Sequence, residues 1–200
     1  MNHISDNNAS DRHLVNSVLS GNSHAFSAII KNTEALVAQI VYKMIDNAED
    51  RRDLAQDVYL KVYANLGNFR FQSKLSTWIA QIAYNTCVSH QQKKKPELPG
   101  FGDFADEEDA TQNFTSGLSS GANVESELFR KQRSAILTTA IEKLPPLYKT
   151  LITLFHNEQM SYEEIGEITG LSSGTLKSYL FRARAALKTN LLKKYKKEEL

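Results

Sequence analysis

The sequence predicts an all-α protein of two small helical domains joined by a flexible acidic linker. Apolar residues recur at helical spacing on both sides of a central segment, and no stretch shows the strict alternation of a half-buried strand. The segment 96–124 breaks this pattern with prolines, glycines, serines and acidic residues, a composition typical of linkers. The predicted domains are therefore residues 1–95 and 125–200.

The composition of the 200-residue chain excludes several classes of function. Cys87 is the only cysteine and the five histidines lie in separate segments, so no disulfide, metal site or catalytic cluster is indicated. The first residues lack the apolar run of a signal peptide, and no run of about 18 apolar residues could span a membrane. We expect a cytoplasmic protein without cofactor, membrane insertion or enzymatic activity.

Charge is distributed in blocks, although the net charge is only +1. Residues 51–95 and 171–200 each hold 8 Lys or Arg against 2 Asp or Glu, whereas residues 96–127 hold 8 Asp or Glu and no Lys or Arg. Two basic segments around an acidic one favour two polyanion-binding domains whose linker is repelled by nucleic acid. On charge alone, solvated charged faces are an equal alternative.

The first domain begins with amphipathic helices whose apolar stripes run over 14–19 and 26–44. In the next helix, over 51–66, the residues predicted to face the bundle are Leu54, Val58 and Val62. The residues predicted to face outward are Asp53, Gln56, Asp57, Leu60 and Lys61. An exposed leucine among polar residues suits the anchor of a protein interface, although single exposed apolar residues are also normal.

A helix over 74–94 follows a loop at 68–72 that contains two aromatic residues and an arginine. The apolar stripe of this helix is predicted to contain Leu75, Trp78, Ile79, Ile82 and Thr86. The opposite, outward side is predicted to carry Ser73, Thr77, Gln81, Tyr84, Val88 and Gln91. Unpaired bases stack on aromatic groups at about 1–3 kcal/mol each, so this domain is predicted to bind single-stranded nucleic acid. Trp78 is expected in the core first, while Phe69 and Phe71 divide between core and stacking.

The second domain is predicted to contain helices over 125–143, 146–157, 161–168 and 173–195. Ser161 and Glu164 have the spacing of a capping box, and Gly170 can adopt the positive φ at which the third helix stops. Ser172 or Ser173 then caps the fourth helix. A helix, a tight turn and a second helix indicate a helix-turn-helix motif.

The last helix has the pattern of a major-groove reader. Its apolar stripe comprises Leu176, Leu180, Ala183 and Leu187. The opposite side combines small residues with potential donors to bases and phosphates: Thr175, Lys177, Ser178, Arg182, Arg184, Ala185 and Lys188. The alternative is an amphipathic surface helix with solvated basic residues.

Taken together, these motifs resemble the extracytoplasmic-function (ECF) group of sigma factors in the sigma-70 family. The resemblance rests on DLAQDVYLKVYANLGNF, LSTWIAQIAYNT and LPPLYKTLITLFHNEQMSYEEIGEITGLSSGTLKSYLFRARAAL, separated by an acidic linker, and covers nearly the whole chain. It implies a transcription initiation factor that binds core RNA polymerase, recognises the minus-35 duplex and captures the minus-10 non-template strand. The first domain would be region two and the second region four, and an anti-sigma factor would be a further partner.

The resemblance also implies three sets of site residues. Core polymerase would be bound by Asp53, Gln56, Asp57, Leu60 and Lys61. The melted minus-10 strand would be bound by Phe69, Arg70, Ser73, Lys74, Trp78, Tyr84 and Asn85. The minus-35 duplex would be read by Thr175, Lys177, Ser178, Tyr179, Arg182 and Arg184. Departures from the usual pattern occur at Gly166, at Tyr179, and at Ser89, His90 and Gln92, which replace an acidic residue and arginines.

Two other functions remain open from the sequence. A dimeric DNA-binding regulator would also use a helix-turn-helix, but it leaves the aromatic loop and Leu60 unexplained. An adaptor that binds only proteins, such as a decoy for an anti-sigma factor, is disfavoured by the basic flanks of the last helix.

Overall fold

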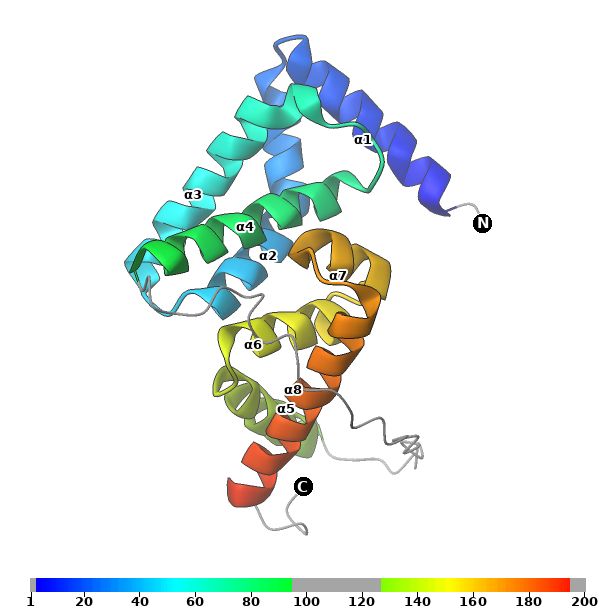
Figure 1. Ribbon diagram of the computed structural model, residues 1–200. Helices are drawn as coiled ribbons and strands as arrows, with labels where there is room; N and C mark the ends of the chain where they lie inside the picture. Colours follow the sequence, from blue (N-terminus) through cyan, green and yellow to red (C-terminus); the bar gives the residue numbers. More distant parts are fainter. Residues whose placement is uncertain (1–2, 95–126, 195–200) are drawn as a thin grey trace.

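The computed structural model describes residues 3–94 and 127–194, and every regular element within these ranges is a helix (Figure 1). The first domain contains α1 (His3–Leu19), α2 (Ser23–Met44), α3 (Ala48–Asn65), a 3-10 turn η1 (Leu66–Asn68) and α4 (Leu75–Lys94). The second contains α5 (Glu127–Glu142), α6 (Pro146–Ile152), a π-helical turn η2 (Thr153–Asn157), α7 (Tyr162–Thr169) and α8 (Ser173–Lys194). The predicted all-α class is confirmed. The predicted linker over 96–124 lies outside the described residues.

Asparagine side chains cap the first turns of α2 and α3. The side chain of Asn22 accepts hydrogen bonds from the first turn of α2, and that of Asn47 accepts from the backbone of Glu49 and Asp50 in α3. The inward residues of α3 lie where the spacing predicts, with Val58 and Val62 completely buried. None of the described helices has the length and apolar character needed to cross a membrane.

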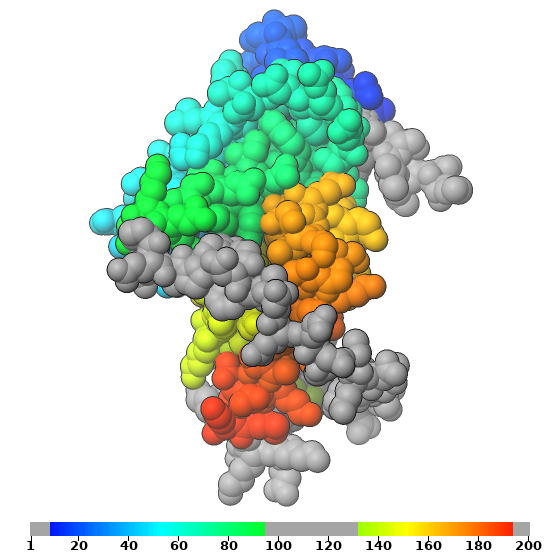
Figure 2. All heavy atoms as spheres, viewed as in Figure 1, coloured from blue at the N-terminus to red at the C-terminus, as the bar shows by residue number. Residues whose placement is uncertain are grey.

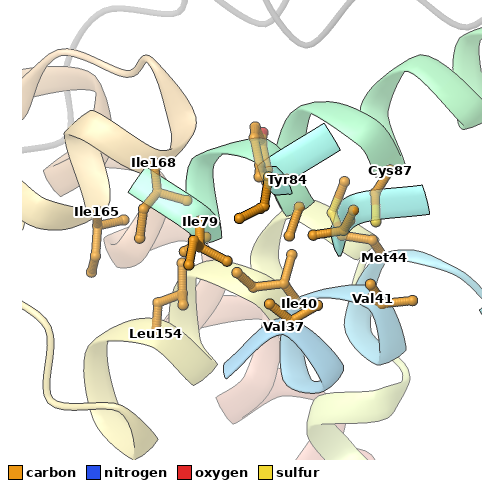
Figure 3. Close-up of a cluster of buried hydrophobic side chains, with 14 of the residues drawn as sticks. Val37, Ile40, Val41, Met44, Ile79, Tyr84, Cys87, Leu154, Ile165 and Ile168 are labelled. Carbon is orange, nitrogen blue, oxygen red and sulfur yellow. The ribbon is translucent and has the colours of Figure 1, made fainter. Parts of the chain in front are cut away.

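The two domains share one continuous apolar core. Ile40 of α2 and Ile79 of α4 lie beside Leu154, Ile165 and Ile168 of the second domain, and all five side chains are buried (Figure 3). Figures 1 and 2 show α7 lying directly against α4. This contact was not predicted, because the linker indicated two domains able to act at separate sites.

Of the ion pairs that cross the interface, two are reciprocal. Lys43 of α2 pairs with Glu142 of α5, and Lys149 of α6 lies with its Nζ 3.7 Å from Asp46 Oδ1. Both lysines are buried. Each domain therefore inserts an ammonium group that meets a carboxylate of the other domain, which fixes the register of the contact because an unpaired buried charge is costly.

The contact between α7 and α4 covers the helix face predicted to meet nucleic acid. Thr77 is buried, and Tyr84 is only 3% exposed. Gln81 Nε2 donates to the carbonyl of Glu167 at 2.8 Å. The prediction that Tyr84 points outward is therefore wrong, because the second domain packs on this side of α4.

Candidate nucleic-acid and protein interfaces

The outward face of α3 is as predicted and carries an exposed apolar pair. Leu60 is 70% exposed, and Tyr63, one turn later, is 59% exposed with its ring edge against Phe26 at 5.0 Å between centroids. Asp53 and Gln56 are exposed on the same helix. Tyr63 was not among the predicted interface residues, although its spacing of three residues from Leu60 places it on the same face.

Lys61 lies between the outward face of α3 and a groove in the surface. Its Nζ lies 2.8 Å from Asp57 Oδ2 and donates to Thr86 Oγ1 of α4 at 3.2 Å. The side chain thus lies over the junction of α3 and α4, where it borders a groove.

The groove lies between the end of α3, η1 and α4, and its volume is about 370 Å³. Its lining consists of one indole, one aliphatic group and six polar side chains: Lys61, Asn65, Asn68, Trp78, Ile82, Asn85, Thr86 and Ser89. Trp78 and Asn85 were predicted to bind single-stranded DNA, and Lys61 to bind polymerase. The other lining residues were not predicted to bind a ligand, because the three segments that carry them come together only in the fold.

The other predicted strand-binding residues lie around the groove rather than in it. Phe69 is buried, and its ring packs against Phe71 at 4.7 Å and against Trp78 at 5.2 Å between centroids. Arg70 is exposed and Ser73 is partly buried. Lys74 Nζ lies 2.7 Å from Glu164 Oε1 of α7, so its charge is engaged in the contact between the domains.

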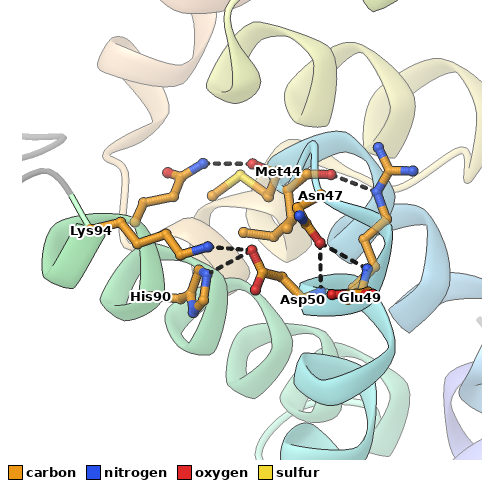
Figure 4. Close-up of polar contacts among 9 residues, drawn as sticks. Met44, Asn47, Glu49, Asp50, His90 and Lys94 are labelled. Carbon is orange, nitrogen blue, oxygen red and sulfur yellow. Dashed lines mark hydrogen bonds and ion pairs between the residues drawn. The ribbon is translucent and has the colours of Figure 1, made fainter.

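The last turns of α4, where the sequence departs from the usual sigma-factor pattern, are anchored to the α2–α3 corner (Figure 4). Gln91 Nε2 donates to the carbonyl of Met44, and Lys94 Nζ lies 2.5 Å from Asp50 Oδ2. His90 lies 3.4 Å from the same carboxylate oxygen. The hydrogen bond from Lys94 contributes most to lowering the pKa of Asp50, and the nearby His90 adds to it. His90 is thus a structural residue, whereas Ser89 faces the groove.

The helix-turn-helix of α7 and α8 follows the predicted local signals. Ser161 Oγ accepts from the backbone of Glu164, whose carboxylate accepts from the Ser161 backbone in return. Gly170 ends α7 with a φ of 74°, and Ser172 Oγ accepts from the backbone of Thr175 at the start of α8. A Cβ at Gly166 would lie 3.1 Å from the carbonyl oxygen of Leu171, so a glycine permits the close approach of the turn.

The outer side of α8 presents basic and small residues to solvent. Lys177, Ser178 and Arg184 are exposed, while Thr175 and Arg182 are partly buried. The guanidinium of Arg184 lies 5.4 Å from the centre of the Phe155 ring and next to His156. Partial burial, together with this guanidinium, lowers the pKa of His156, which leaves the basic charge at this position to Arg184.

Tyr179 is the exception among the predicted duplex-binding residues. It is 4% exposed and packs its ring 6.2 Å from that of Tyr148. The resemblance assigned Tyr179 to the duplex, but its ring is buried here, because the apolar side of α8 is wider than the stripe of Leu176, Leu180, Ala183 and Leu187.

Cys87, on the inner side of α4, is buried, and burial raises the pKa of its thiol to about 12. A thiol with that pKa is almost entirely protonated near neutral pH and therefore unreactive. In the part of the chain that the structure describes, no group of three or more His, Cys, Asp or Glu residues could hold a metal ion.

Comparison with known proteins places these features in one family. The family model for sigma-70 region 2 matches residues 29–97, and that for sigma-70 region 4 matches residues 134–187. The ECF RNA polymerase sigma factor SigW of Bacillus subtilis is 30% identical over 177 residues, covering 88% of this chain and 94% of the relative. The ECF RNA polymerase sigma-E factor of Escherichia coli is 32% identical over 179 residues, covering 88% and 92%.

A solved structure shows the same fold at lower identity. The sigma factor RpoE from Bartonella quintana, crystallised with the anti-sigma factor NepR, is 24% identical to this chain with a TM-score of 0.58, covering 84% of this chain and 96% of the other. The two regions, their order and the coverage of both chains agree. This protein therefore belongs to the ECF group of the sigma-70 family, whose members are transcription initiation factors and not enzymes.

Proposed function

We propose that this protein directs core RNA polymerase to specific promoters through three separate surfaces. The outward face of α3 docks on polymerase, the groove between α3 and α4 captures an unpaired base of the minus-10 non-template strand, and α8 reads the minus-35 duplex. The observation that carries the proposal is the groove. It is large enough for a nucleobase, and Lys61, which lines it, follows the exposed Leu60 on α3.

The chemistry of the groove suits an unstacked base. The indole of Trp78 offers a stacking surface, and the amides of Asn65, Asn68 and Asn85 offer both donors and acceptors to a base edge. Lys61 at the rim provides a positive charge for a strand phosphate. A base taken out of the duplex loses a few kcal/mol of stacking and pairing, which contacts of this kind must offset.

Simultaneous binding of both promoter elements requires the domains to separate. Elements centred roughly 25 base pairs apart lie about 85 Å apart along B-DNA, whereas a compact chain of this length has a radius of gyration of about 16 Å. The residues between Lys94 and Glu127 would reach about 100 Å if fully extended. Opening would also expose Thr77 and Tyr84 to the strand. An anti-sigma factor, like the one bound to the similar Bartonella protein, is the expected regulator of this step.

The proposal is tested by run-off transcription from genomic fragments, with purified core RNA polymerase in the presence and absence of this protein. Discrete transcripts that depend on the protein are expected. Binding to polymerase without any transcript would favour the adaptor, and a DNA shift without polymerase binding would favour a stand-alone regulator.

Asn85→Asp should reduce the fraction of open promoter about tenfold, because base contacts of this kind contribute about 1–3 kcal/mol and the substitution places a negative charge beside the strand. The change keeps the shape of the side chain, so the fold is retained. Permanganate reactivity of unpaired thymines measures opening. Asn32→Asp, on an exposed position of α2, is the matched control and should have no effect; equal opening by both variants would remove the groove from the proposal.

Replacing both Lys177 and Arg184 by alanine should weaken binding of holoenzyme to duplex minus-35 DNA and leave polymerase binding unchanged. Each phosphate contact that is lost should lower the salt dependence of binding by about one unit. Titrations at several salt concentrations measure this slope. Lys31→Ala, on the exposed side of α2, controls for a change in net charge, and an unchanged slope in the double variant would mean that α8 does not meet the duplex.

A further inference from the structure

The loop between η1 and α4 is held by α1, a helix that has no place in the function described so far. Two adjacent residues of α1 make the contacts. Asp11 Oδ2 accepts a hydrogen bond from the backbone N–H of Leu75 at 3.0 Å, and the guanidinium of Arg12 lies 4.4 Å from the centre of the Phe71 ring.

The contact of Asp11 supplies a helix cap from a distant part of the chain. The first backbone N–H groups of a helix have no partner within it, and a side-chain oxygen normally accepts from one of them. Lys74, which precedes α4, has no such oxygen. The Asp11 carboxylate fills this role from 64 residues away, and its negative charge also suits the positive end of α4.

The contact of Arg12 holds a residue in an unfavourable backbone conformation. Phe71 has a φ of 57°, a left-handed value that costs a residue with a side chain of order 1 kcal/mol or more. Its ring contacts both Phe69 and the Arg12 guanidinium. A cation over an aromatic ring is attracted to it, so the contact favours this conformation.

A series of ring contacts connects Phe71 to the groove. Phe71 packs on Phe69, Phe69 packs on Trp78, and Trp78 lines the groove in the first turn of α4, the turn that Asp11 caps. Asn68, at the other end of the loop, lines the groove as well.

We infer that Asp11 and Arg12 are positioning residues for strand capture: they fix the loop and the first turn of α4, and thereby the shape of the groove, without touching the DNA. The inference rests on the proposed function of the groove. It assigns to α1 a part in promoter opening that is distinct from polymerase docking and from duplex binding.

The test compares Asp11→Ala, Asp11→Asn and Arg12→Ala in holoenzyme on a promoter fragment selected by run-off transcription. Asparagine also caps helices well, so Asp11→Asn should open promoter within about twofold of wild type, whereas Asp11→Ala should open about fivefold less. Arg12→Ala should open about threefold less. Asn16→Ala, at an exposed position of α1, should match the wild type.

A second readout needs neither polymerase nor DNA. Trp78 is the only tryptophan of the chain, so its emission reports on the ring stack directly. Asp11→Ala and Arg12→Ala should shift the emission to longer wavelength at unchanged far-ultraviolet circular dichroism, and Asp11→Asn should restore the wild-type spectrum.

The outcomes separate the two hypotheses. Wild-type protein that gives no transcript would refute the proposed function. Wild-type transcription with Asp11→Ala and Arg12→Ala indistinguishable from wild type in opening and emission would refute the inference alone. Loss of opening in Asp11→Ala without rescue by Asp11→Asn would also refute the capping role.

Discussion

Leu60→Glu should weaken the binding of core RNA polymerase by about 30-fold, the effect of losing roughly 2 kcal/mol at an interface hot spot. Leu60 is the most exposed of the large apolar side chains on the described surface. Glutamate would replace this apolar group by a charge that must lose its hydration on docking. Competition of the variant against labelled wild-type protein for core polymerase measures the change.

A matched variant separates docking from general effects of an added charge. Leu192, on α8 of the second domain, is 48% exposed, and Leu192→Glu should bind core polymerase as the wild type does. Equal affinity of Leu60→Glu and wild type would show that polymerase uses another face of the first domain.

Lys43→Glu should open the contact between the domains. The substitution places two carboxylates together at a buried position, and disrupting a buried ion pair costs about 3–5 kcal/mol. The equilibrium constant for the closed state, in which the domains are in contact, should fall by about 100-fold or more. Combining this change with Glu142→Lys restores opposite charges and should restore the closed state.

Energy transfer between two dyes measures the opening. Cysteines introduced at Asn32 of α2 and Ser134 of α5, both exposed positions, can be labelled selectively because Cys87 is buried and its thiol is protonated. Transfer efficiency should fall in Lys43→Glu and recover in the double variant.

The control is Lys143→Glu, which makes the same charge change next to Glu142 at an exposed position and should leave the transfer unchanged. Unchanged efficiency in Lys43→Glu, or no recovery in the double variant, would contradict a closed state stabilised by this pair.

The helix-turn-helix could be predicted in detail because its signals are local. The capping box at Ser161, the left-handed Gly170 and the cap at Ser172 each act within four residues of the backbone groups that they satisfy. Helical periodicity placed Leu60 outward and Val58 inward on α3 for the same reason.

The faces of α4 could not be predicted in this way, because periodicity finds an apolar stripe but not the partner of the opposite side. The side of α4 that carries Thr77, Gln81 and Tyr84 is covered by the second domain, which follows only after the predicted linker. The groove could not be predicted for the same reason, because its lining residues Lys61, Asn68 and Asn85 come from three elements that meet only in the fold. The position of Tyr179 could not be predicted either, because a tyrosine has both an apolar ring and a polar hydroxyl and therefore suits a buried position as well as a ligand contact.

The two anchors of α4 have a joint consequence for the energetics of promoter melting. A carboxylate from α1 binds the first turn of the helix, and a carboxylate from α3 binds its last turns through Lys94. Because both ends are held by other helices, much of the conformational entropy of α4 is already lost when the protein folds. In the proposed function, the captured strand would meet a helix that is already ordered, so ordering α4 would add little to the free-energy cost of melting the promoter.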